Sequence, residues 1–104
     1  MSRPWHGSQA ARRRKFRRLH EALCRVYGVR AQLVFGGWYS RYWIAERAIH
    51  LAELSVVTYL HEFAHARGWR ERQACRWSIN LFRRVFPREF ARCRRDGHVL
   101  RKRR

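Results

Sequence analysis

The chain has 104 residues, the length of one domain, and its 46% hydrophobic content excludes a wholly disordered polar protein. It contains 25 Lys and Arg residues against 7 Asp and Glu residues, a formal net charge of +18. This excess predicts an anionic partner, with nucleic acid as the first candidate. An arginine-rich composition unrelated to binding is the alternative interpretation.

Membrane insertion and secretion are not expected. No apolar run approaches the ~20 residues that cross a bilayer, and residues 1–7 lack the apolar stretch of a secretory signal. There are three cysteines, Cys24, Cys75 and Cys93, which is an odd number, and no two of them form a C-x-x-C motif. They are predicted to be buried thiols on helices rather than a disulfide framework. We therefore expect a cytoplasmic protein, with association to the nucleoid as a further option.

A single domain is expected, with a lead-in over residues 1–8, a folded core over 9–95 and a basic tail over 96–104. Ser8 can cap a first helix that runs to about Tyr27 and is closed by Gly28. Its apolar stripe would consist of Phe16, Leu19, Leu23, Val26 and Tyr27. Its opposite face is basic and is predicted to contact phosphates, with a merely solvated face as the alternative. The basic residues are Arg12, Arg13, Arg14, Lys15, Arg17 and Arg18.

Three short strands are predicted next, over residues 29–35, 38–44 and 48–51. Gly36-Gly37 is typical of a hairpin turn, so the middle of the chain is expected to be a small antiparallel β-meander. Basic and aromatic residues alternate in this region. Aromatic side chains on a sheet can stack nucleic-acid bases, but they more often belong to the core.

The remainder of the chain is predicted to be mainly helical. Ser55 can cap a helix that ends at Gly68, and a third helix is expected from Glu71 to about residue 86. Pro87 should end it, a short helix is expected over 88–95, and Asp96-Gly97 is typical of a turn. The tail adds four candidate nucleic-acid-binding residues, Arg101, Lys102, Arg103 and Arg104. The fold class is therefore predicted to be α+β, with one or two C-terminal helices.

The sequence H-E-F-A-H at residues 61–65 lies within the second predicted helix. His61 and His65 are four residues apart, which puts both imidazoles on one helix face, where they can bind the same Zn²⁺ ion. Glu62 would lie beside such a metal and suits a general base. Glu71 is the predicted third ligand, because Gly68 permits a sharp turn that brings it back toward the histidines.

The third ligand is left open at this point. Competing candidates are His98, Glu53 and His50, of which His98 is the strongest. Glu71 could instead be an acidic residue placed in the first turn of a helix by the helix macrodipole. The residue that would stabilise an oxyanion is also undecided, and the candidates are Tyr59, His50 and nearby arginines.

The run H-E-F-A-H-A-R-G-W-R-E over residues 61–71 resembles the zincin metallopeptidases. The only methionine is Met1, so the Met-turn of the metzincins is absent. After Glu71 the chain has a small residue, an aromatic residue and a closing proline. This pattern of Ala74, Trp77 and Pro87 resembles the ImmA/IrrE-type peptidases. The phrase H-E-F-A-H-A-R-G-W also resembles the SprT-like proteases, which act on proteins bound to DNA.

This resemblance implies a minimal zincin-like core within residues 9–95 and hydrolysis of a peptide bond. Zinc held by His61, His65 and Glu71 would activate water, with Glu62 as the general base. The strand over 48–51 would be the sheet edge that pairs with an extended protein or peptide substrate. The charge would place this zinc metalloendopeptidase at or near DNA or RNA.

Two other hypotheses belong to different functional classes. The chain could be a basic nucleic-acid-binding protein whose zinc site is structural or vestigial. It could also be a basic subunit of a nucleoprotein assembly, with its arginines buried against RNA or acidic protein.

Overall fold

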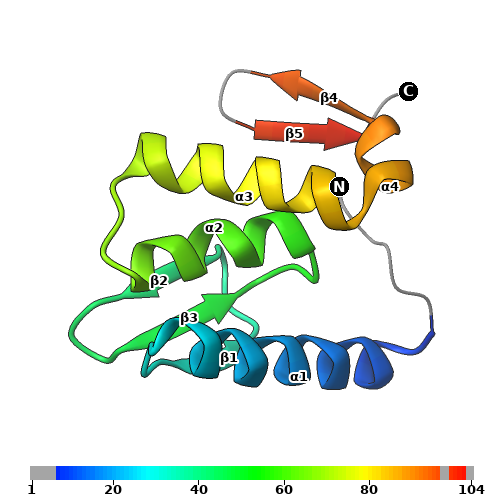
Figure 1. Ribbon diagram of the computed structural model, residues 1–104. Coiled ribbons are helices and arrows are strands. Elements are labelled where there is room, and N and C mark those ends of the chain that lie inside the picture. Colours follow the sequence, from blue (N-terminus) through cyan, green and yellow to red (C-terminus); the bar gives the residue numbers. More distant parts are fainter. Residues whose placement is uncertain (1–6, 97–98, 103–104) are drawn as a thin grey trace.

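The computed structural model describes residues 7–96 and 99–102, and it confirms the α+β class with an N-terminal helix, a small sheet and C-terminal helices (Figure 1). The elements are α1 (Gln9–Tyr27), β1 (Gln32–Phe35), β2 (Arg41–Trp43), β3 (Ala48–Leu51), α2 (Val56–Ala66), α3 (Glu71–Val85), α4 (Pro87–Ala91), β4 (Cys93–Asp96) and β5 (Val99–Lys102). None of the helices in the described ranges combines the length and the hydropathy that a bilayer span requires.

The predicted antiparallel meander is wrong in its strand order and in one of its pairings. The strands lie in the order β1-β3-β2, with β1 parallel and β2 antiparallel to β3. The tight turn is formed not by Gly36-Gly37 but by residues 44–47, where the Arg47 N–H donates to the Ile44 carbonyl at 3.2 Å. The five residues between β1 and β2 are too many for a two-residue hairpin, and β3 occupies the place between the two strands.

The central position of β3 follows from its composition. Ala48, Ile49 and Leu51 are each at most 2% exposed, whereas Leu33 is the only buried residue of β1 and no residue of β2 is buried. A strand with three of its four residues buried suits the middle of the sheet, and the more exposed strands suit its edges. The expectation that 48–51 forms the sheet edge is therefore wrong, and β2 is the edge strand beside α2.

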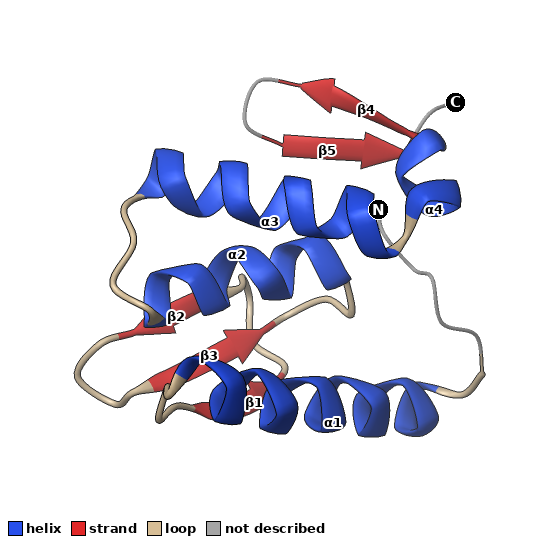
Figure 2. Ribbon diagram, in the orientation of Figure 1, coloured by secondary structure: helices blue, strands red, loops and turns tan. Residues whose placement is uncertain are grey.

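The helices α1 and α2 cover the same face of the sheet (Figure 2). Phe16 of α1 packs edge-on against Tyr59 of α2, with ring centroids 5.9 Å apart, and both side chains join Ile49 in the core. The start of α1 agrees with its prediction, because the Ser8 hydroxyl accepts a hydrogen bond from the Ala11 N–H. The predicted stripe is wrong at Val26, which is 73% exposed, because the helix turns His20 rather than Val26 toward the core.

The helices α2 and α3 form an antiparallel pair with a short connection. The Ser55 side chain accepts from the Thr58 N–H at the start of α2. After α2, Gly68 has φ +89°, a backbone conformation that L side chains rarely adopt. The chain therefore reverses within residues 67–70 and begins α3 at Glu71, as the sequence predicted.

The C-terminal predictions need two corrections. The short helix expected over 88–95 ends at Ala91, and the next residues form β4, so Cys93 lies on a strand rather than on a helix. The expected basic tail contains β5, which pairs antiparallel with β4 in the register Asp96↔Val99. Cys93 is 7% exposed and belongs to the core, which gives β4 an apolar contact that an isolated tail would lack.

Candidate metal centre

The described residues bring the predicted ligands His61, His65 and Glu71 together at one place between α2 and the start of α3. The two histidine Nε2 atoms are 3.1 Å apart. The Glu71 Oε1 atom lies 3.0 Å from the Nε2 atom of His61 and 2.9 Å from that of His65. The histidines are one turn apart on α2. The chain reverses at Gly68, and this reversal brings the Glu71 carboxylate, at the start of α3, back to the two imidazoles.

Hydrogen bonds on the far side of each ligand direct these three atoms toward one another. His65 donates a hydrogen bond from Nδ1 to the Trp69 carbonyl at 2.8 Å. In the neutral ring, Nε2 then carries no proton and has a lone pair available. The Cys75 thiol donates to Glu71 Oε2 at 3.4 Å, and its sulfur lies 3.4 Å from the Nδ1 atom of His61. An Nδ1–H on His61 would donate to this sulfur and leave its Nε2 as a lone pair as well.

In this tautomer three lone pairs converge, and they repel one another unless a metal ion or a proton lies between them. Zinc bonds to nitrogen and oxygen of about 2.0–2.2 Å give tetrahedral ligand atoms ~3.4 Å apart, close to the triangle seen here. Two neutral imidazoles and one carboxylate are also a donor set that zinc commonly takes, with a fourth position left for water or substrate. The residues present therefore fit a zinc ion held by three protein ligands.

The carboxylate of Glu71 is stabilised in its charged form by this arrangement. Partial burial acts to raise the pKa of Glu71, but the nearby His61 and hydrogen bonds with His61, His65 and Cys75 outweigh it, so the pKa is lowered. This carboxylate is therefore ionised at neutral pH. The histidine contribution applies when a proton, rather than a metal, lies between Nε2 and the carboxylate. A metal cation would act on Glu71 in the same direction.

Glu62 does not join the ligand triangle. It follows His61 on α2, and its side chain turns toward the sheet, where Oε1 accepts a hydrogen bond from the Tyr42 N–H at 2.9 Å. Burial raises the pKa of Glu62, against the opposing influence of His61, the Tyr42 N–H and His65. A half-buried carboxylate with a raised pKa, adjacent to a ligand, has the properties of a general base.

The alternative ligands lie elsewhere or outside the described residues. His50 is paired with Glu46 at 3.1 Å, and the Glu53 carboxylate accepts from the Thr58 hydroxyl at 3.5 Å. Neither residue belongs to the cluster of His61, His65 and Glu71. His98 is outside the described residues.

Tyr59, an open candidate for oxyanion stabilisation, has a different role. Its side chain is fully buried, and its hydroxyl lies 2.7 Å from the Nδ1 atom of His20. His20 in turn contacts the Ala31 carbonyl through Nε2 at 2.7 Å. A neutral His20 satisfies both bonds by donating from Nε2 and accepting from the Tyr59 hydroxyl. Tyr59 therefore links α1 and α2 inside the core.

Sequence reasoning missed the residues that orient the ligands. Cys75 was predicted only as a buried thiol, although its spacing of four residues from Glu71 on α3 places both side chains on one helix face. The backbone carbonyl of Trp69 and the backbone N–H of Tyr42 carry no signal in the sequence, because every residue except proline offers the same groups.

The predicted nucleic-acid residues of α1 are mostly accessible. Arg14, Lys15, Arg17 and Arg18 are exposed, whereas Arg12 and Arg13 are half-buried. The guanidinium groups of Arg13 and Arg17 lie over the Phe35 ring, 5.3 and 4.9 Å from its centroid. Of the tail residues, Arg101 and Lys102 lie on β5, and Arg103 and Arg104 are outside the described residues.

This geometry stands without support from relatives. Comparison of the chain with protein-family models, with curated proteins and with solved structures found no match in any of the three.

Proposed function

We propose that this chain is a zinc-dependent metallopeptidase that hydrolyses peptide bonds with Glu62 as the general base. The observation that carries the proposal is the triangle of His61 Nε2, His65 Nε2 and Glu71 Oε1, whose sides measure 2.9–3.1 Å. A carboxylate with a raised pKa follows the first of these ligands directly.

A zinc ion held by these residues would polarise the scissile carbonyl and lower the pKa of a coordinated water toward ~7. Glu62 takes a proton from the attacking water and later delivers it to the leaving amine. The hydrogen bond from the Tyr42 N–H fixes the carboxylate for both transfers. Burial strengthens the basicity of the carboxylate, since it disfavours the charged form and so raises the pKa.

The edge strand β2 is the proposed binding surface for an extended substrate. Tyr42 pairs with Ile49 of β3 in register, yet its N–H points to Glu62 and hence away from β3. In an antiparallel ladder, this backbone belongs to a non-hydrogen-bonded pair, and its N–H and carbonyl face the outer edge. A substrate added to this edge would lie beside Glu62.

Metal analysis of the purified full chain tests the site directly. The unmodified protein should hold about one zinc per chain, and less than ~0.2 zinc per chain under non-chelating conditions would contradict the proposal. His61→Ala and Glu71→Ala should each lose the metal. His50→Ala is the matched control, because His50 lies outside the ligand cluster and should leave the zinc content unchanged.

The second candidate function is binding of nucleic acid, either as the location of the peptidase or as the main role of the chain. Its support is the charge of +18 and the scarcity of ion pairs. Among the arginines of residues 7–93, whose side chains the structure describes, only Arg92 pairs with a carboxylate, that of Glu89 at 3.5 Å. An affinity for DNA or RNA that barely changes between low and high salt would argue against this candidate.

A further inference from the structure

One face of the three-stranded sheet carries no helix. Because side chains alternate along a strand, the register places Gln32, Val34, Arg41, Trp43 and His50 on the face opposite to the buried Ile49. We call this surface, together with Trp38 and Tyr39 of the preceding loop, the open sheet face. The helices α1 and α2 lie on the other side, against the face that carries Leu33, Ile49 and Leu51.

The open sheet face and its rim gather most of the exposed aromatic residues of the described chain. Trp38 is 99% exposed, Tyr39 55% and Trp43 37%, and Tyr27 is the only other aromatic side chain in this exposed group. These rings do not belong to the core, so the expectation that the aromatic residues of this region are packed inside fails for these three. Tyr42, which faces the helices, is the member of the group that packs against the core.

The rings of Tyr39, Trp43 and His50 form a connected row with a positive charge beside it, and Trp38 precedes Tyr39 in the chain. The ring centroids of Tyr39 and Trp43 are 6.4 Å apart, and those of Trp43 and His50 are 6.0 Å apart. The Arg41 guanidinium lies over Trp43, 4.8 Å from its centroid. The nearby carboxylate of Glu46 is already paired with His50 at 3.1 Å, so it leaves Arg41 available to an external anion.

From this arrangement, we infer that the open sheet face binds unpaired bases of single-stranded nucleic acid, with the rings of Trp38, Tyr39 and Trp43 as stacking partners. Exposed aromatic rings interleaved with arginine match the two components of such a strand, since bases stack on rings and phosphates pair with guanidinium groups. A duplex keeps its bases stacked on one another and cannot offer their faces to the rings. Single strands are therefore the form that this surface can recognise.

This surface is distinct from the metal centre but shares β2 with it. Tyr42 faces inward and holds Glu62 through its backbone, whereas its neighbours Arg41 and Trp43 face the open side. The proposal does not rest on the peptidase function, since none of the three rings contacts a ligand. If the chain both cleaves peptides and binds nucleic acid, the bound nucleic acid would lie next to the edge of β2 that pairs with a peptide substrate.

Fluorescence anisotropy with a labelled oligothymidylate of about 15 nucleotides tests the inference on the full chain. The single strand should bind more tightly than a duplex of equal length, and Trp38→Ala or Trp43→Ala should weaken it about 5- to 100-fold. Trp43→Phe should retain most of the affinity because it keeps an aromatic face. Arg41→Gln should weaken binding more than Arg84→Gln, a matched charge change on an exposed residue of α3.

Unchanged affinity in Trp38→Ala and Trp43→Ala would overturn the inference, as would a preference for the duplex. Trp38 lies outside the strands, so its substitution leaves the sheet intact, and circular dichroism checks the fold of every variant. Binding to anionic phosphatidylglycerol vesicles that depends on Trp38, without such dependence for the oligonucleotide, would assign the face to a membrane surface instead. Zinc content should remain unchanged in all these variants, so failure of this inference is distinguishable from failure of the metal site.

Discussion

The carboxylate of Glu62 accepts a hydrogen bond of 2.9 Å from the backbone N–H of Tyr42, and this bond joins the proposed general base to the edge strand of the sheet. Its donor is a main-chain group, so the side chain at position 42 is free to serve the core. The same short strand therefore orients the base, offers an edge to a substrate and presents Arg41 and Trp43 on the opposite face. The proposed general base and both proposed binding surfaces therefore meet at the three residues of β2.

Replacement of Glu62 by Gln separates metal binding from chemistry. The amide oxygen of Gln can still accept from the Tyr42 N–H, so the fold and the zinc content should be preserved. The variant lacks a proton acceptor of suitable basicity, and the rate of peptide hydrolysis should fall by at least ~100-fold. Cleavage of a casein or peptide library, with zinc measured on the same samples, checks both. Cleavage at the unmodified rate would show that Glu62 is not the base.

The Cys75 thiol should act as a positioning group for the ligands, because it contacts both His61 and Glu71 at 3.4 Å. Cys75→Val puts a small apolar side chain at this position and removes these contacts, so zinc affinity should fall by about 10- to 100-fold. Competition with a chelator measures this change. Cys93→Val is the control, since the Cys93 thiol donates to the Glu89 carbonyl and does not contact a ligand. Equal zinc affinity in the two variants would contradict the role of Cys75.

The parts of the site that the sequence could predict are those fixed by local periodicity. The spacing of His61 and His65 on a helix determines their common face, and Gly68 marks the reversal that returns Glu71. These inferences need no knowledge of the sheet. The contacts of Cys75 and Trp69 depend on how α3 packs against α2, which periodicity alone does not define.

The errors arose where pairing between distant segments decides the structure. Local sequence features predicted three strands in the regions of β1, β2 and β3 but could not show that β3 inserts between the other two. The Gly36-Gly37 pair is typical of a hairpin, yet the turn formed at residues 44–47, where Arg47 adopts φ 49°. The strand β4, which follows Ala91, was likewise missed. Its Cys93 packs against the core, and this tertiary contact cannot be inferred from the arginine-rich sequence around it.

Arg67 should contribute to stability through the aromatic rings that surround it. Its guanidinium lies 4.1 Å from the ring centroid of Tyr27, 4.2 Å from that of Trp69 and 5.6 Å from that of Trp77. Arg67→Gln should lower the free energy of unfolding by about 1–2 kcal/mol. It should also weaken zinc binding, because the carbonyl of Trp69 orients His65.

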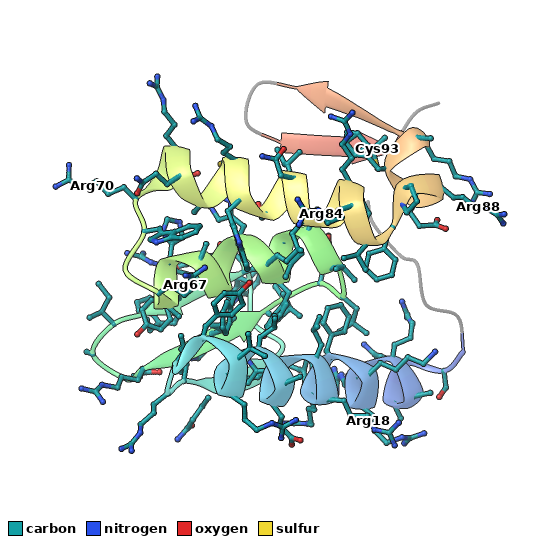
Figure 3. All side chains as sticks on the ribbon, in the orientation of Figure 1. Arg18, Arg67, Arg70, Arg84, Arg88 and Cys93 are labelled. Atoms are coloured by element: carbon teal, nitrogen blue, oxygen red, sulfur yellow. The ribbon has the colours of Figure 1, made fainter. Side chains whose placement is uncertain are left out.

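Arg70 provides the matched control for Arg67. It is exposed and points away from the molecule, whereas Arg67 lies beside the helix end (Figure 3). Arg70→Gln removes the same charge and should change the free energy of unfolding by less than ~0.5 kcal/mol. Chemical denaturation of the two variants measures both values. Equal losses would mean that the charge, and not the contact with the rings, is responsible.

The buried His20 should make the fold sensitive to acid. Burial lowers the pKa of His20, against smaller opposing influences of the Ala31 carbonyl and Glu21 and with a small further contribution from Arg17. In the unfolded chain the imidazole titrates near ~6.5. As pH falls through this value, the unfolded state takes up a proton that the folded state resists, so stability is lost by up to ~1.4 kcal/mol per pH unit. Above that pH the contribution is fully present.

Urea denaturation at several pH values between 5 and 8 should reveal this dependence. His20→Gln should show a smaller slope below pH 6.5 than the unmodified chain. Val26→Ala is the control, because this exposed residue of the same helix has no titratable group and should keep the original slope. The same slope in His20→Gln and in the unmodified chain would place the origin of the acid sensitivity elsewhere.

The exposed basic residues of α1 should contribute electrostatic contacts that differ from stacking on the open sheet face. Replacement of Arg14, Lys15 and Arg18 by Gln should lower the slope of log K against log salt by up to about 3 for a duplex, roughly one unit for each lost phosphate contact. Replacement of Arg76, Arg84 and Arg88 removes the same charge from exposed positions on α3 and α4 and serves as the control. If both triple variants lower the slope equally, the binding is governed by net charge, and α1 holds no particular phosphate site. A larger loss in the α1 variant would instead locate the duplex on this helix, on the side of the sheet away from Trp43.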